Sequence, residues 1–228
     1  MKSLKNQQSG FTLVEIAIVL VIIGLLLGGI LKGQELINSA KVKNLAQDFK
    51  TVPLYIYGYQ DRFKALPGDD PKANSNLPGP PAAQLAGGTI GNGVIDGFWN
   101  STTLTDESYL FWQHVRMANF AAGVTDYTDT VNYPPKNVEG GRMGITSNTG
   151  ANQAVAGMSG TYVFCSSGLL GKYAKQLDTT LDDGNPATGS VRTILNSQTA
   201  TATALPLTGS TVTDHVDDAS SYTVCMAF

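Results

Sequence analysis

The chain has 228 residues, enough for one or two small domains, and its 42% of hydrophobic residues is ordinary for a globular protein. Its 15 basic and 18 acidic side chains give a net charge of −3, which argues against a nucleic-acid partner, because non-specific binding requires clustered positive charge. The two cysteines, Cys165 and Cys225, would usually pair in an exported domain and stay free in the cytosol.

The first predicted element is an apolar run from Phe11 to Leu31. A helix over these 21 residues rises about 31 Å, the thickness of the hydrocarbon core of a bilayer. A secretory signal peptide has a shorter core that ends at small residues, whereas this run continues into LKGQELI without such a site. A plain membrane anchor explains the length, but it explains neither Glu15 nor the short basic leader that ends at Gly10.

The leader and the start of the run, MKSLKNQQSG followed by FTLVEIAIVLVIIGLL, resemble the N-terminus of type IV prepilins and of type II secretion pseudopilins. In that family a membrane peptidase cuts after the last Gly of the leader and methylates the new N-terminal residue, and the fifth mature residue is Glu. The resemblance therefore implies that residues 1–10 are a leader peptide, that cleavage follows Gly10, that Phe11 is N-methylated and that Glu15 acts in assembly.

Glu15 is the only acid in the apolar run. A carboxylate in the middle of a membrane helix costs roughly 2.5–3.5 kcal/mol, but Glu15 lies about one turn into the helix, where it can reach the headgroups. In a filament of such helices an unpaired charge would be costly. The resemblance supplies a partner, the amine of Phe11 on an adjacent subunit, and this pairing would fix the axial register. The alternative is a snorkelling acid without a role.

Three glycines, Gly24, Gly28 and Gly29, interrupt the same run. Small residues let membrane helices approach closely, and each Gly weakens a helix by about 1 kcal/mol relative to Ala. In filaments of the resembled family this part of the helix melts on assembly, so these glycines are predicted to act in assembly. Some members carry a Pro near this point and this chain does not, which leaves the extent of melting open.

The helix is predicted to continue over residues 32–65, beyond the membrane-spanning or filament-core part at 11–31. An apolar stripe with helical spacing runs along it, and Pro53 predicts a bend without a break because the stripe resumes on the same face. Pro67 and Gly68 then end the helix. The stripe consists of Val42, Leu45, Phe49, Val52, Ile56, Tyr59 and Phe63.

Residues 66–228 are predicted to form a globular pilin head of α+β class, with a small antiparallel sheet lying on the long helix. Residues 66–103 are rich in turn residues. A second helix is expected to start near Thr103 or Thr105, to end at Gly123 and to turn Leu104, Phe111 and Ala122 to the core. A short helix is expected at 169–181 and an exposed loop at 196–213. The predicted strands are 142–146, 161–165, 190–195 and 221–226.

With the head outside the cytoplasm, Cys165 and Cys225 are predicted to form a disulfide, as pilins commonly have between the C-terminal segment and the sheet. The closed loop of about 60 residues is worth roughly 4 kcal/mol on the chain-entropy model. The alternative is two buried free thiols.

Asp178, Asp182 and Asp183 lie at the end of a predicted helix, where carboxylates oppose the helix dipole. Close-spaced acids and turn carbonyls suit Ca²⁺, and several pseudopilins bind calcium in a loop of the head, so a calcium site is one prediction. The alternative is that these acids cap turns. The loops at 68–71 and 91–97 also offer oxygens, without EF-hand spacing. The histidines, His114 and His215, lack metal-site or catalytic spacing, so no enzymatic activity is expected.

The sequence therefore predicts a structural subunit of a type IV pilus, major or minor. The alternatives are a type II secretion pseudopilin and, further off, a membrane-anchored binding or sensor domain. The implied partners are other pilin subunits, the prepilin peptidase, an inner-membrane assembly platform and membrane lipid. The implied location is the bacterial inner membrane, with a cytoplasmic N-terminus set by Lys2 and Lys5, and then a periplasmic or cell-surface filament.

Overall fold

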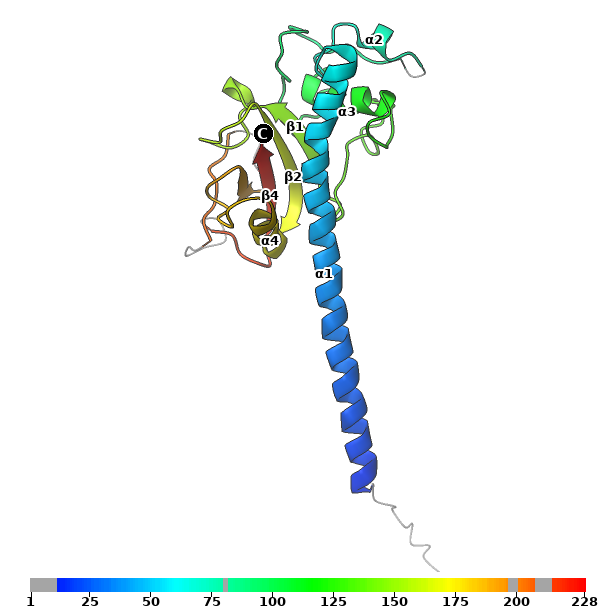
Figure 1. Cartoon of the computed structure of the whole chain (residues 1–228), viewed down its shortest axis with the longest axis vertical. Coiled ribbons are helices and arrows are strands. Elements are labelled where there is room, and N and C mark those ends of the chain that lie inside the picture. Colours follow the sequence, from blue (N-terminus) through cyan, green and yellow to red (C-terminus); the bar gives the residue numbers. More distant parts are fainter. Residues whose placement is uncertain (1–11, 80–81, 197–200, 208–214) are drawn as a thin grey trace, which may run out of the picture. The chain divides into compact units, whose positions relative to one another are not determined.

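The computed structural model describes residues 12–79, 82–196, 201–207 and 215–228, with only the backbone of Ala151. The chain divides into two compact units, one up to Lys41 and one from Val42 onward, and each is described by itself (Figure 1). The helices are α1 (Leu13–Phe63), α2 (Ala73–Asn76), α3 (Glu107–Met117) and α4 (Gly171–Leu181), with a 3-10 turn at Gly150–Asn152. The strands are β1 (Met143–Ser147), β2 (Tyr162–Leu170), β3 (Val191–Leu195) and β4 (Ser221–Ala227).

The predicted long helix is confirmed as α1, which is helical through Pro53. All the stripe residues except Phe63, which is half-buried, lie in the core of the C-terminal unit. The helix ends where predicted because Lys64 takes a left-handed φ of 56°, which helical residues do not adopt. The amide of Lys64 still donates to the carbonyl of Gln60, at 2.9 Å.

The four strands form one antiparallel sheet in the order β1-β2-β4-β3. The C-terminal strand β4 therefore lies in the interior of the sheet, and Figure 1 shows it beside β2. Each predicted strand is present within one residue of its expected bounds, except that β2 continues to Leu170 instead of ending at Cys165. The result is the α+β class that the sequence predicts, with a small sheet and short helices.

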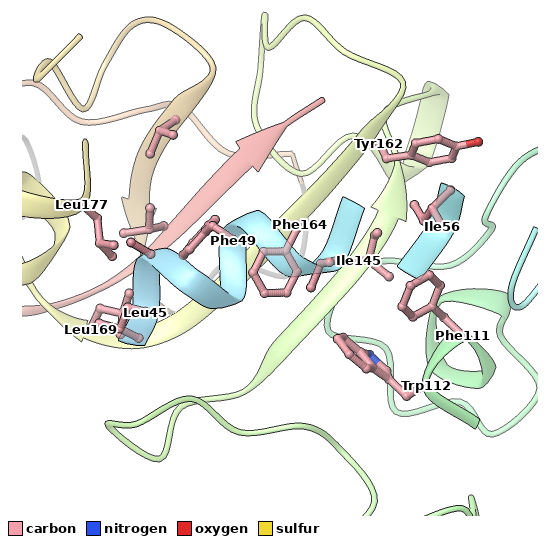
Figure 2. Close-up of a cluster of buried hydrophobic side chains, with 14 of the residues drawn as sticks. Leu45, Phe49, Ile56, Phe111, Trp112, Ile145, Tyr162, Phe164, Leu169 and Leu177 are labelled. Atoms are coloured by element: carbon pink, nitrogen blue, oxygen red, sulfur yellow. The ribbon is translucent and has the colours of Figure 1, made fainter. Parts of the chain in front are cut away.

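The two faces of the sheet belong to two hydrophobic cores. Alternate residues of a strand point to opposite faces, so Phe164 packs in the core that contains α1, α3 and α4, whereas Cys165 packs in the other. In the first core the rings of Phe49 and Phe164 meet edge to face with centroids 4.9 Å apart (Figure 2). The second core lies under loops and includes Trp99, Val155 and Ala202.

Several local expectations for the head are wrong. Helix α3 ends at Met117 and not at Gly123, because Asn119 adopts a left-handed φ of 65°. Ala122 is therefore exposed instead of facing the core. The loop expected to be exposed after Asn196 contributes buried residues, because Ala202 pairs with Val155 in an isolated parallel bridge.

Candidate assembly site

The N-terminal part of α1 is apolar on all sides. Its best 18-residue window has a mean hydropathy of 2.8, and none of that window is buried within the chain. A helix that is hydrophobic all round is stable only in lipid or among other apolar helices. By length and composition this segment is able to cross a membrane.

Glu15 and Thr12 form a capping box at the start of this helix. The Thr12 amide and hydroxyl donate to Oε2 of Glu15 at 2.8 and 2.7 Å, and the Glu15 amide donates to the Thr12 hydroxyl at 3.2 Å. These bonds satisfy amides that have no partner within the helix, and they place a carboxylate at the positive end of the helix dipole. Within lipid an unsatisfied amide costs several kcal/mol, so the box stabilises the helix start.

This contact was not predicted from the sequence, although TLVE is the residue pattern of a capping box. The contact changes the expected role of Glu15, because the acid has a local partner before any neighbouring subunit arrives. Both bonds to the carboxylate use Oε2, and Oε1 has no hydrogen-bond partner in the described part of the chain. The box therefore holds the side chain in place and leaves one carboxylate oxygen available.

The space beside the glycines of this segment is empty. A Cβ added at Gly24, Gly28 or Gly29 would meet no atom within 4 Å. The segment is continuous α-helix in the single chain, so any melting belongs to assembly. Beyond it, Lys32 and Glu35 form an exposed ion pair at 2.7 Å. Gly10 and Phe11, the predicted processing residues, lie outside the described residues.

The predicted disulfide is present between Cys165 and Cys225. These residues are direct cross-strand partners in β2 and β4, with Cα atoms 4.0 Å apart. Both are fully buried in the second core. The bond therefore joins the C-terminal strand to its neighbour on the face of the sheet that faces away from α1.

The three acids predicted as calcium ligands serve different purposes. Asp182 accepts the amide of Val191 at 2.8 Å, and Asp183 accepts the amide of Asn185 at 2.8 Å, which are turn and strand caps. Asp178 is fully buried without a hydrogen bond of normal geometry, and burial raises its pKa to about 6. Among the residues described, no three acidic, His or Cys side chains converge as a metal site requires. Calcium binding stays a prediction.

A buried polar network holds the loops near the end of α1. His114 is fully buried, with Nδ1 accepting the Gly68 amide at 2.9 Å and Nε2 facing the Gln84 carbonyl at 2.8 Å, so the imidazole is neutral and structural. Glu107 accepts the Asp96 amide at 2.8 Å and lies next to Asp69. Burial, followed by the charges of these acids, raises the pKa of Glu107 to about 8.

Comparison with known proteins bears on the N-terminal segment. Residues 5–31 match the prokaryotic N-terminal methylation motif, the hallmark of prepilin-like proteins of the type IV pilin and pseudopilin class. This match confirms the resemblance seen in the sequence. No curated protein and no solved structure shows significant similarity to the chain. The chain therefore carries the prepilin-type methylation motif, and its long apolar helix and small antiparallel sheet give it a pilin-like α+β fold.

Proposed function

We propose that the chain is a structural subunit of a type IV pilus, major or minor, and that it is not an enzyme. Cleavage after Gly10 removes the leader and makes Phe11 the methylated N-terminus. Before assembly the apolar helix lies in the inner membrane, in contact with lipid, the prepilin peptidase and the assembly platform. After assembly it lies among the same helices of other subunits in a cell-surface filament. The N-terminal methylation motif supports this proposal.

The observation that carries the proposal is the geometry of Glu15. In the filament, Oε2 stays bound to Thr12, and Oε1 accepts the amine of Phe11 on the adjacent subunit. The capping box supports this arrangement because it orients the carboxylate before the neighbour arrives, which lowers the ordering cost of the contact. The pair is enclosed by apolar side chains, so breaking it by removing one partner costs about 3–5 kcal/mol per contact.

Three variants separate the two roles of Glu15. Glu15→Gln keeps an acceptor for the Thr12 amide, since Gln also serves in a capping box, but it removes the charge. Thr12→Val keeps the charge and removes the hydroxyl, which weakens the helix start by about 0.5–2 kcal/mol. Glu15→Ala removes both functions. We expect Thr12→Val to form fewer fibres and both Glu15 variants to form none, measured by electron microscopy and quantification of sheared fibres.

The contrary result is normal fibre formation by Glu15→Gln together with failure of Glu15→Ala. That outcome would assign Glu15 to capping alone and remove the charge pair from the mechanism. Membrane accumulation of each variant, measured by fractionation, provides the control that the chain is made and inserted.

The second candidate is a pseudopilin of type II secretion, because the methylation motif is common to both classes. The buried disulfide favours the pilus, since pilins commonly tie their C-terminal segment to the sheet in this way. A deletion strain distinguishes them: loss of surface fibres supports the pilus, whereas loss of protein secretion with no change in fibres supports the pseudopilin.

A further inference from the structure

The head contains a pocket of about 770 Å³, within the range of small-ligand sites. Three segments that are distant in sequence build it: the last turn of α1 with the chain that follows, the glycine turn at 91–93, and the first residue of β2. Its lining includes Gln60, Phe63, Lys64, Lys72, Asn76 and Tyr162, together with Asp69 and Asp70. The pocket therefore combines amides, aromatic rings, two ammonium groups and two acids.

The acids of the pocket are already occupied by the protein. Asp69 accepts the backbone amides of Gly91 and Gly93, the latter at 2.7 Å. Positive φ angles of 80° at both glycines turn these amides toward the carboxylate, a conformation that favours glycine. Asp70 accepts the hydroxyl of Tyr59 at 2.8 Å and the side-chain amide of Asn76 at 2.7 Å. Both carboxylates are almost fully buried and have little capacity left for a ligand.

The groups that remain available are mainly donors. Within the described residues, the Gln60 amide, the Lys72 ammonium and the Tyr162 hydroxyl have no hydrogen-bond partner, although all three line the pocket. Burial raises the pKa of Tyr162, so its hydroxyl stays protonated and can donate. Figure 2 shows this hydroxyl pointing away from Phe164. Lys64 has one exposed contact, to Asp61 at 3.4 Å.

The pocket is preorganised. Lys64 occupies the left-handed position that ends α1, where glycine is the usual residue, and it belongs to the lining of the pocket. The chain that follows α1 is held by the bonds to Asp69 and Asp70, and by the Gly68 amide on buried His114. A site whose groups are held before binding loses less entropy when it binds a ligand.

We propose that this pocket binds an acidic saccharide of roughly disaccharide size. Lys64 and Lys72 take the carboxylate, because charge-assisted hydrogen bonds to an ammonium are stronger than neutral ones. Gln60 and the free Oδ1 of Asn76 suit sugar hydroxyls, and the rings of Phe63 and Tyr162 suit the apolar face of a sugar ring. An acidic peptide would use the ammonium groups but has less need of the amides and rings.

The test uses the full chain in detergent and isothermal titration calorimetry with digalacturonate. Lactose, a neutral disaccharide, and triglutamate, an acidic peptide, are titrated in parallel. We expect digalacturonate to bind more tightly than both. Lys72→Glu should weaken it about tenfold or more, and Tyr162→Phe about fivefold, from the loss of a charged and a neutral hydrogen bond. Lys43→Glu is the matched control, because Lys43 is an exposed lysine of α1 outside the pocket lining.

Equal binding of lactose, tighter binding of triglutamate, or no binding of digalacturonate would each overturn the proposal. An equal loss of affinity in Lys43→Glu and Lys72→Glu would also overturn it, because the loss would then come from the net charge of the protein and not from the pocket. Lys72→Gln and the thermal unfolding midpoint of each variant distinguish a lost contact from a disturbed loop. The saccharide site and the filament proposal can fail separately, because the filament proposal rests on Glu15 and assigns no role to these side chains.

Discussion

Single residues of the head show where charge is buried. Glu107 is 1% exposed, and its Oε1 faces no donor in the described structure. Its neighbour is the carboxylate of Asp69, which already accepts backbone amides. Two buried carboxylates in contact are costly unless one of them is protonated. With its pKa raised to about 8 by burial and by the neighbouring acids, Glu107 is predicted to keep its proton near neutral pH.

Stability is predicted to fall as pH rises past neutrality. The pKa of Glu107 is about 8 in the folded chain against an ordinary value of 4.5, so its stabilising effect is complete below 4.5 and is lost as pH rises through 8. Glu107→Gln keeps the shape of the side chain and removes its titratable proton. The free energy of unfolding of the variant and of the wild type is measured by denaturant titration at pH 5 and at pH 9. Relative to the wild type, the variant should be more stable at pH 9 than at pH 5. Asp61→Asn, at an exposed acid, should show no such change.

The contribution of His114 to stability changes with pH in the opposite direction to that of Glu107. Burial lowers its pKa below the ordinary 6.5, so its contribution is complete above 6.5 and is lost as pH falls through the folded value. In the wild type Glu107 masks this effect, because the two contributions change in opposite directions below 6.5. The Glu107→Gln variant should expose it as a loss of stability on acidification. If the double variant Glu107→Gln with His114→Gln loses as much stability on acidification as Glu107→Gln alone, the loss does not come from His114 and the prediction is wrong.

Among the elements, helix α1 and the sheet differ in how far the sequence determines them. The stripe from Val42 to Tyr59 could be read from its spacing alone, because helical periodicity is a local property. The interior position of β4 could not, because pairing with β2 and β3 depends on residues far apart in the chain. The helix α2 was not predicted, because a segment of four residues is too short to show a helical periodicity.

The glycines of α1 lead to a prediction about assembly. Gly24→Ala should strengthen the helix by about 1 kcal/mol without a clash, since its outer side is empty. If this region melts in the filament, the variant should insert normally and form fewer fibres. Gly33→Ala is the control, because Gly33 is equally open but lies outside the predicted melting region. Equal fibre yields from the two variants, counted in sheared fractions, would argue against melting.

The disulfide is predicted to stabilise the sheet. Cys165 and Cys225 close a loop with a sequence separation of 60. Replacing both by Ala should lower the free energy of unfolding by about 4 kcal/mol on the chain-entropy model. Denaturant unfolding in detergent measures the change, with the reduced wild type as a second reference. Unchanged stability in the double variant would show that packing of the second core alone holds β4.

At the scale of the whole molecule, the sequence predicted the class of protein and little of the head's interior. The order Gly10, Phe11, Glu15 identified the methylation motif because the motif is a contiguous segment and is therefore visible in the sequence. The pocket beside Tyr162 escaped prediction, since three distant segments form it. The acids at 178–183 show the same limit: Asp182 is close to Asp178 in sequence, but its carboxylate accepts the amide of Val191. Calcium binding there stays a prediction.

The most direct test of the filament proposal is the intact mass of this chain recovered from sheared surface fibres. The prediction is a chain that lacks residues 1–10 and begins with N-methylated Phe11. Recovery only from membranes, with an N-terminus at Met1 or Lys2, would contradict it.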